Sequence, residues 1–394
     1  MAVNVLNYAF TLVMGRLLPV AAFGEIAALF ALQLVTGVPS ATLTAIAAKF
    51  AGQFSGRGQG GHVARLIWGG RRLGLRIAVV TATLLLITTP VLSTILHIRM
   101  LPIALFALLC GVGALLALEQ GILQGLQRFG AAAVANVLPT VVKLALGVVL
   151  VWVGWGVEGV LTALLVGTLI GWGYSRAATR DASLAIPSSD TDYPHGSVAS
   201  HGRVILAVTL LSALFTNADI LLGKVFLAPQ MAGEYSALTV VGKVVLYGAG
   251  AFAAVVLPLI SSATDHAKSR RDMLFSSLAA AAFMAVGAAV AFTLFPGIAV
   301  DLLLGGAYAN VVEYLPGYAW AMAMGVIGLL LTNYLIARER REALYPLAAG
   351  LIVELTCLAL WHGGIADYVM ANLACNAVFL VLAISFTLRE RSHA

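Results

Sequence analysis

Charged side chains are rare in this sequence, and several of them stand within long apolar runs. A charge at the centre of a bilayer is costly and seldom faces lipid, so such residues indicate a function inside the membrane. Basic side chains suit an anionic substrate, because an ammonium offers a point charge to phosphate. An acid held away from water can take up and release a proton near neutral pH, which suits ion coupling. The candidates for substrate binding are Arg16, Lys143, Lys224 and Lys243, and those for ion coupling are Asp219 and Glu354.

Each of these charges also has a structural interpretation. Arg16, Lys224 and Glu119 lie near the ends of apolar runs, where long side chains reach the lipid headgroups. The remaining candidates lie deeper, and there the alternative is an ion pair that holds helices together. Counting about 1.5 Å per residue places Asp219 and Glu354 near the midplane of their helices. These two acids are therefore the deepest charges that the sequence predicts.

The elements that must position these charges are transmembrane helices. The chain of 394 residues is 61% hydrophobic and 10% charged, with a mean hydropathy of +0.98. A soluble domain carries roughly 25% charged residues, so lipid is the solvent that this surface favours. We predict an all-α polytopic membrane protein with about twelve transmembrane helices, near residues 3–18, 25–48, 73–96, 102–123, 131–153, 159–175, 204–227, 235–260, 274–298, 316–337, 344–361 and 364–387.

A polar stretch rich in Ser, Asp and Pro divides the chain into two halves. It predicts a cytoplasmic linker over 177–203, between an N-terminal six-helix lobe (1–176) and a C-terminal six-helix lobe (204–394). Residues 15–29, GRLLPVAAFGEIAAL, are similar to residues 223–238, GKVFLAPQMAGEYSAL. Because each half has an even number of helices, we expect two lobes related by a parallel repeat about an axis along the membrane normal.

The repeat places Lys143 and Glu354 at equivalent depths in equivalent helices. They are of opposite sign, so they could face each other across a cavity between the lobes. The alternative is that each faces the interior of its own lobe.

The loop charges predict the orientation of the chain. Alternate connections carry most of the basic residues, including Arg57, Arg128 and Arg271, whereas the opposite side carries Arg16 and Arg99. Basic loops stay in the cytoplasm. We therefore predict a multi-pass protein of the cytoplasmic (inner) cell membrane with both termini in the cytoplasm.

Other motifs predict architecture more than chemistry. Cys110, Cys357 and Cys375 fall in apolar runs and favour neither a disulfide framework nor a zinc site, and we expect no metal and no cofactor. The chain has no GxxxxGK[ST] motif for ATP, and nothing in it indicates a nucleic-acid partner. The GxxxG runs at 121–125 and 167–171 predict close helix packing. Bends are favoured at Pro39, Pro90, Pro139, Pro258 and Pro346.

Several stretches resemble the Wzx-type polysaccharide-biosynthesis flippases of the multidrug/oligosaccharidyl-lipid/polysaccharide exporter superfamily. They are NYAFTLVMGRLLPVAAFGEIAALFAL at the start, ILQGLQRFGAAAVANVLP, NADILLGKVFLAPQMAGEYSAL with Asp219 at the acidic position typical of the family, and IAVDLLLGGAYANVVEYLPGYA. The chain departs from the family's pattern at its start, where the first helix is short for a span of about 20 residues.

The resemblance implies a MATE-like fold and a membrane transporter rather than an enzyme. It implies a polyprenyl-diphosphate-linked oligosaccharide as substrate, moved to the outer leaflet by ion-coupled alternating access for export of surface polysaccharide. A polysaccharide polymerase and glycosyltransferases are the further partners that it suggests. In that reading the diphosphate supplies the anion for the basic residues.

Three alternatives stay open at this stage. A MATE-like multidrug exporter would favour an acid-rich cavity for cationic drugs. A flippase for a lipid-linked peptidoglycan precursor commonly has extra helices. A membrane glycosyltransferase or polymerase would need a large outer loop with catalytic acids or histidines, whereas the loops expected outside are short.

Overall fold

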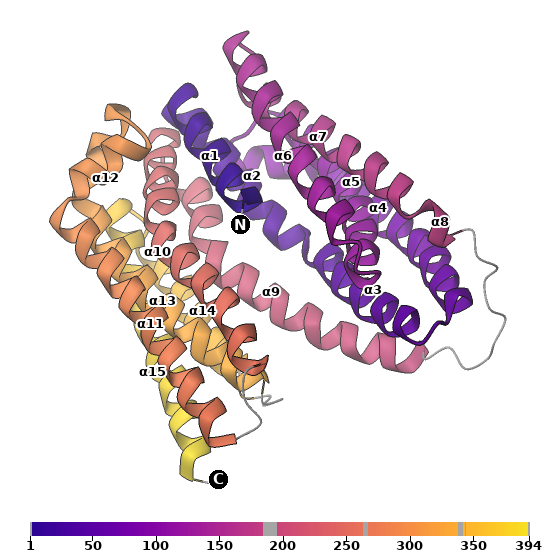
Figure 1. Cartoon of the computed structure of the whole chain (residues 1–394). Coiled ribbons are helices and arrows are strands. Elements are labelled where there is room, and N and C mark those ends of the chain that lie inside the picture. Colours follow the sequence, from indigo (N-terminus) through magenta and orange to yellow (C-terminus); the bar gives the residue numbers. More distant parts are fainter. Residues whose placement is uncertain (1, 184–194, 263–266, 338–341, 343, 393–394) are drawn as a thin grey trace. The chain divides into compact units, whose positions relative to one another are not determined.

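In the computed structural model the described part of the chain folds into α-helices (Figure 1). The structure describes residues 2–183, 195–262, 267–337, 342 and 344–392, and no β-strand occurs in these ranges. The chain forms two compact units, Met1–Ala213 and Leu214–Ala394. The boundary between them falls inside helix α9 (His195–Phe226). The prediction of an all-helical protein is therefore confirmed.

The first unit packs its helices around α5. Its described elements before α9 are α1 (Ala2–Leu17), α2 (Val20–Thr36), α3 (Val38–Gly56), α4 (Gly60–Leu96), α5 (Met100–Gly125), α6 (Phe129–Trp152), α7 (Gly156–Ala178) and α8 (Arg180–Ser183). Helix α5 contacts α3, α4 and α7, while α6 packs against both α7 and α1. Apolar side chains from α3, α4 and α5, among them Phe50, Ile67 and Ile122, form one buried cluster.

The two GxxxG runs allow the close packing that the sequence predicts. A Cβ atom at Gly125 would lie 2.5 Å from the carbonyl oxygen of Ala48, and one at Gly121 would also meet the backbone of α3. The second run, residues 167–171, packs in the same way on α6 at Pro139. Only residues without a side chain let helix backbones approach this closely.

The second unit is built around α13. Its described elements after α9 are α10 (Pro229–Ser262), α11 (Ala267–Leu294), α12 (Pro296–Leu303), the 3₁₀ helix η1 (Gly306–Tyr314), α13 (Leu315–Ala337), α14 (Leu344–Leu360) and α15 (Ile365–Ser392). Helix α13 packs against α10, α11 and α15, and α14 packs against α15. Buried tyrosines on α10, α13 and α15 lie in ring contact with one another, with Tyr235 at the centre.

Two predicted spans are broken rather than straight. The span predicted over 25–48 is divided at Gly37 into α2 and α3, which meet at 47°. Pro39, in the first turn of α3, has no N–H to donate to the preceding turn, so the helix ladder cannot continue there. The span predicted over 274–298 breaks before Pro296, where α11 and α12 meet at 95°. The residue before a proline avoids helical backbone angles, which explains this break.

The other prolines are accommodated within helices. Pro90 and Pro139 lie inside α4 and α6, which run through them without interruption. Pro346 lies in the first turn of α14, where its missing N–H would have had no partner inside the helix. The side chain of Pro258 lies outside the described residues.

Membrane insertion follows from the length and composition of the helices. Seven helical stretches in the described part of the chain can cross a bilayer, and the two bent pairs, counted as one span each, raise the number to nine. Helix α14 is apolar but shorter, with 17 residues. The protein is therefore a multi-pass membrane protein, while the number of twelve spans stays a prediction.

The predicted linker, 177–203, is partly helical. Residues 177–183 belong to α7 and α8, and residues 195–203 to α9, whereas 184–194 lie outside the described residues. The lobe limits 1–176 and 204–394 stay a prediction.

The internal repeat appears as one hydrogen-bond pattern that occurs twice. Leu18 N donates to Met14 O at 3.0 Å, and Leu227 N donates to Gly223 O at 3.0 Å. In both units two residues then separate the first helix from the next, α1 from α2 and α9 from α10. These pairs are 209 residues apart, whereas the first Gly of the two similar sequences, Gly15 and Gly223, are 208 apart. The two helix ends therefore match at an offset of 209 residues, which is also the offset of the second Gly of the two similar sequences, Gly24 and Gly233.

Candidate functional site

Asp219 is the centre of a polar cluster buried inside the second unit. It lies on α9 and is 2% exposed. The phenolic OH of Tyr235 donates to its Oδ2 at 2.7 Å, and that of Tyr318 donates to the same atom at 3.1 Å. Hydroxyl donors satisfy the lone pairs of a carboxylate that apolar helices have removed from water. The acid predicted at this position is therefore held in one orientation by two helices, α10 and α13.

Lys243 supplies the positive charge of the cluster. It lies on α10, and its Nζ is 3.7 Å from Asp219 Oδ1. The same ammonium donates to the backbone carbonyl oxygen of Thr216 at 2.7 Å. The neighbouring Gly242 has no side chain, and a Cβ there would overlap the ring of Tyr318. This glycine lets α13 approach α10 closely enough for Tyr318 to reach the acid.

Glu354 places a second acid beside this pair. It lies on α14, is 1% exposed, and interacts electrostatically with both Asp219 and Lys243. Its Oε2 has no hydrogen-bond partner among the described residues. From α15, Asn372 Nδ2 donates to the hydroxyl of Tyr235 at 3.0 Å and so links a fifth helix to the cluster.

The charges of this cluster do not balance when every group is ionised. Two carboxylates share one ammonium, and an uncompensated charge is expensive to bury. Asp219 accepts two hydroxyl hydrogens on Oδ2 and lies beside Lys243, whereas its Oδ1 has no hydrogen-bond partner among the described residues. Glu354 has no such donors on Oε2, so a proton on this acid would neutralise the cluster. One added proton would therefore balance the charges of the cluster.

Lys143, one of the bases predicted in the first unit, has a different set of partners. On α6, its Nζ donates to Asn7 Oδ1 at 2.5 Å and lies 5.0 Å from the centre of the Phe10 ring. No carboxylate contacts it among the described residues, so its charge is not neutralised there. Lys143 and Glu354 thus each contact residues of their own unit, and a pairing of the two across a cavity between the lobes stays a prediction.

The remaining predicted bases, Arg16 and Lys224, differ from each other in burial. Arg16 is exposed at the end of α1, whereas Lys224, at the end of α9, is 3% exposed. The one-residue change of register explains this, because one residue turns a helix by about 100°. Of the six predicted site residues, the structure brings Asp219, Lys243 and Glu354 together.

Glu119, a buried acid of the first unit, has polar partners that the sequence did not indicate. Glu119, 1% exposed, accepts hydrogen bonds from Arg71 Nε at 2.7 Å and from Thr179 Oγ1 at 2.6 Å. Arg71 lies outside the span predicted over 73–96, but α4 begins at Gly60 and therefore includes it. Arg71 pairs with Glu119 because it lies on α4, which packs against α5. An arginine in a loop would face water instead.

Sequence reasoning also missed the neutral members of the cluster. Tyr235, Tyr318 and Asn372 are uncharged, so a search for charges within apolar runs cannot find them. Their signal is weaker, namely a buried polar group that must find a partner. No group of three or more metal-binding side chains occurs in the described part of the chain.

Comparisons with known proteins place the chain in a family. The profile of the family described as polysaccharide biosynthesis protein matches residues 72–313, more than half of the chain. No curated protein matches the sequence at a significant level.

Solved structures share the fold over almost the whole chain. An inward-facing multidrug resistance MATE family transporter of the MOP superfamily has a TM-score of 0.80 at 12% identity, covering 99% of this chain and 96% of that one. The lipid II flippase MurJ, in an inward closed conformation, has a TM-score of 0.74 at 12% identity, covering 98% and 87%. A MOP superfamily transporter from Pyrococcus furiosus, described as having a binding pocket of reverse polarity, has a TM-score of 0.59 at 15% identity, covering 98% and 92%.

At these identities the likeness shows the fold and not the substrate. The family match and the fold agree with the resemblance that the sequence carries. This chain belongs to the polysaccharide biosynthesis protein family and has a MATE-like fold.

Proposed function

We propose that this protein is a flippase that moves a polyprenyl-diphosphate-linked oligosaccharide across the cytoplasmic membrane for surface polysaccharide biosynthesis. One observation carries the mechanism: two buried acids, Asp219 and Glu354, share a single ammonium, that of Lys243. Family membership supports the substrate class. In this proposal both termini lie in the cytoplasm, and the transporter works with the glycosyltransferases and polymerase that build and extend the glycan.

The coupling ion in this mechanism is a proton. A sodium ion bound to Asp219 would meet the ammonium of Lys243, whose Nζ is 3.7 Å from Oδ1, and the two cations would repel each other. A proton on Glu354 needs no such space and brings the cluster to neutrality. Exchange of this proton would shift the balance between two conformations of the second unit, because each protonation state favours a different packing of the helices around it.

Lys143 is the base that we assign to the diphosphate. Its partners, Asn7 and Phe10, leave its positive charge uncompensated, whereas the charge of Lys243 is offset by Asp219. An uncompensated ammonium beside apolar helices gains more from a phosphate than a paired one does. Lys143 thus supports substrate recognition, and the Asp219 cluster supports coupling.

The test is a flipping assay with the purified full-length protein in liposomes. A fluorescent polyprenyl-diphosphate oligosaccharide is the probe, and its loss from one leaflet is followed by chemical quenching under a pH gradient or a sodium gradient. We expect flipping to respond to the pH gradient and not to sodium. Glu354→Gln should remove that response, and the control Glu313→Gln, an exposed acid of the same unit, should keep it.

Substrate recognition is tested separately from coupling. Lys143→Gln should raise the substrate concentration needed for half-maximal flipping while the response to pH is kept, and Lys49→Gln, an exposed lysine of the same unit, should change neither. Flipping driven by sodium alone would refute proton coupling. Export of cationic dyes without any flipping of the lipid-linked oligosaccharide would identify a multidrug exporter instead.

A further inference from the structure

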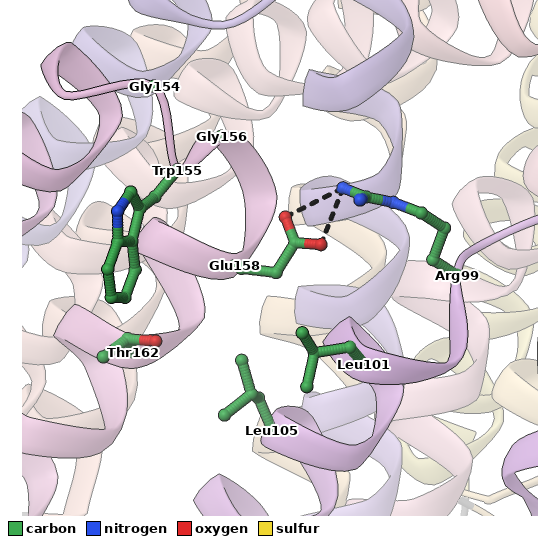
Figure 2. Close-up of a pocket in the computed structure, with 8 residues that line it drawn as sticks. All are labelled: Arg99, Leu101, Leu105, Gly154, Trp155, Gly156, Glu158 and Thr162. Carbon is green, nitrogen blue, oxygen red and sulfur yellow. Dashed lines mark hydrogen bonds and ion pairs between the residues drawn. The ribbon is translucent and has the colours of Figure 1, made fainter.

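A pocket of about 540 Å³ lies in the first unit, and none of its lining residues belongs to the clusters described above. Its walls come from the connections between α4 and α5 and between α6 and α7, together with the first turns of α5 and α7. Figure 2 shows Glu158 in the middle, with Trp155 on one side, Arg99 on the other, and Leu101 and Leu105 below. The pocket therefore has a polar level, formed by Arg99 and Glu158, and an apolar level, formed by Leu101 and Leu105.

The polar level is an ion pair with spare bonding capacity. Arg99 Nη2 lies 2.6 Å from Glu158 Oε1 and 2.9 Å from Oε2, so one nitrogen serves both oxygens (Figure 2). The other guanidinium nitrogens have no protein partner among the described residues. The side chain of Arg99 is 73% exposed and that of Glu158 is 15% exposed. An anion can therefore reach Arg99 while a cation reaches Glu158, and the two sites lie next to each other.

The apolar level lies deeper along the helices. Leu105 is five residues beyond the start of α5, which corresponds to about 7.5 Å. Trp155 stands at the start of α7 and is 52% exposed, as expected of an aromatic residue at the boundary between hydrocarbon and water. With Trp155 at this boundary, we expect the pocket to begin at the level of the lipid headgroups and to continue to the first acyl methylenes.

The connections that form the rim are held in place by their own backbone. Trp155 N donates to Leu150 O, and Gly154 N donates to Val151 O, both at 3.0 Å. Gly154 has φ of 95°, a conformation that a side chain would strain. A rim that is fixed before the ligand arrives loses little entropy on binding.

We propose that this pocket binds a zwitterionic phospholipid whose headgroup carries a primary ammonium, such as phosphatidylethanolamine. The phosphate takes the free donors of Arg99, and the ammonium donates to Glu158. The glycerol lies beside Trp155, and the first methylenes lie on Leu101 and Leu105. The site is independent of the proposed transport reaction.

The paired charges select against other ligands. A diphosphate or an anionic headgroup without an ammonium would meet the carboxylate of Glu158, which repels it. A choline headgroup has no N–H to donate to this acid. A soluble oligosaccharide could use the ion pair and Trp155, but it has no use for the apolar level formed by Leu101 and Leu105.

The experiment measures which lipids stay bound to the full-length protein. The protein is reconstituted in vesicles with equal parts of phosphatidylethanolamine, phosphatidylcholine and phosphatidylglycerol, extracted in mild detergent, and examined by native mass spectrometry. We expect phosphatidylethanolamine to be retained in preference. Arg99→Gln and Glu158→Gln should each lower its retention by about tenfold, the effect of one lost charge-assisted hydrogen bond. Arg57→Gln, which removes an exposed charge from the connection between α3 and α4, should have no effect.

A second measurement guards against loss of folding in the variants. In the wild type, successive methylation of the lipid amine should weaken retention, with the largest loss at the trimethyl form. Equal retention of the three lipids would overturn the proposal, as would retention that neither variant changes. If a soluble oligosaccharide quenches the fluorescence that Trp155→Phe removes, and phosphatidylethanolamine does not, the pocket is a carbohydrate site and the proposal is wrong.

Discussion

Replacing Arg71 with methionine should destabilise the first unit by about 3–5 kcal/mol, because it leaves the carboxylate of Glu119 buried and unpaired. Glu119 is 1% exposed and accepts bonds from Arg71 Nε at 2.7 Å, Arg71 Nη2 at 3.2 Å and Thr179 Oγ1 at 2.6 Å. The change removes the cation and two of these bonds, and the hydroxyl of Thr179 is what remains. The side chain of Arg71 is 18% exposed, so water can replace a small part of the loss and favours the lower end of the range.

The double variant Arg71→Met, Glu119→Leu tests whether the loss of stability comes from the unpaired carboxylate of Glu119. Removing both charges also removes the desolvation cost, so the double variant should be close to wild type or more stable by about 1–4 kcal/mol. The control is Arg72→Met, because Arg72 is the exposed neighbour and its loss changes the net charge equally. An exposed charge contributes about 0–1 kcal/mol.

The assay is reversible unfolding of the purified protein in mixed micelles, with denaturing detergent as the variable and helix content as the signal. Free energies of unfolding for the single and double variants form a double-mutant cycle. If Arg71→Met costs no more than Arg72→Met, the ion pair does not hold α4 to α5. If the double variant is less stable than Arg71→Met alone, Glu119 is not left uncompensated in the single variant.

Three further predictions concern packing, pH and orientation. Gly125→Ala should destabilise the protein by about 1–3 kcal/mol in the same unfolding assay, since its Cβ would press on the backbone of α3, whereas Gly113→Ala, which has open space, should not. Hydrogen bonds from Arg128 lower the pKa of Asp181 to about 2, so the pair stabilises the folded state above the unfolded pKa of about 3.9 and is lost as pH falls through about 2. Wild type should therefore lose its stability advantage over Asp181→Asn between about pH 4 and pH 2, and an advantage unchanged by pH would contradict this. A reporter fusion at Gly58 should give a cytoplasmic signal, and fusions at Gly156 and Gly363 should give an external signal. The reverse pattern would overturn the predicted orientation.

Helix positions were largely predictable from the sequence because they depend on local apolar runs. The runs predicted near 102–123 and 131–153 became α5 (Met100–Gly125) and α6 (Phe129–Trp152). The break between α11 and α12 was not predicted, since the apolar run continues through Phe295 and only the backbone at Pro296 interrupts it. The similarity between the halves was also visible, and the ends of α1 and α9 match at the offset of its second Gly, 209 residues.

The sequence by itself determined that the chain inserts into a membrane, which family it resembles, and which charges lie too deep within apolar runs to face lipid. These properties depend on composition and on spacing along one helix, and both can be counted directly in the sequence. The tertiary structure decided which of the charges meet. Asp219 and Lys243 come together with Glu354, 111 residues further along the chain than Lys243, because α9, α10 and α14 pack in one unit. Lys143 takes Asn7 as its partner instead. Burial penalises any unpaired charge, and packing alone supplies the partner.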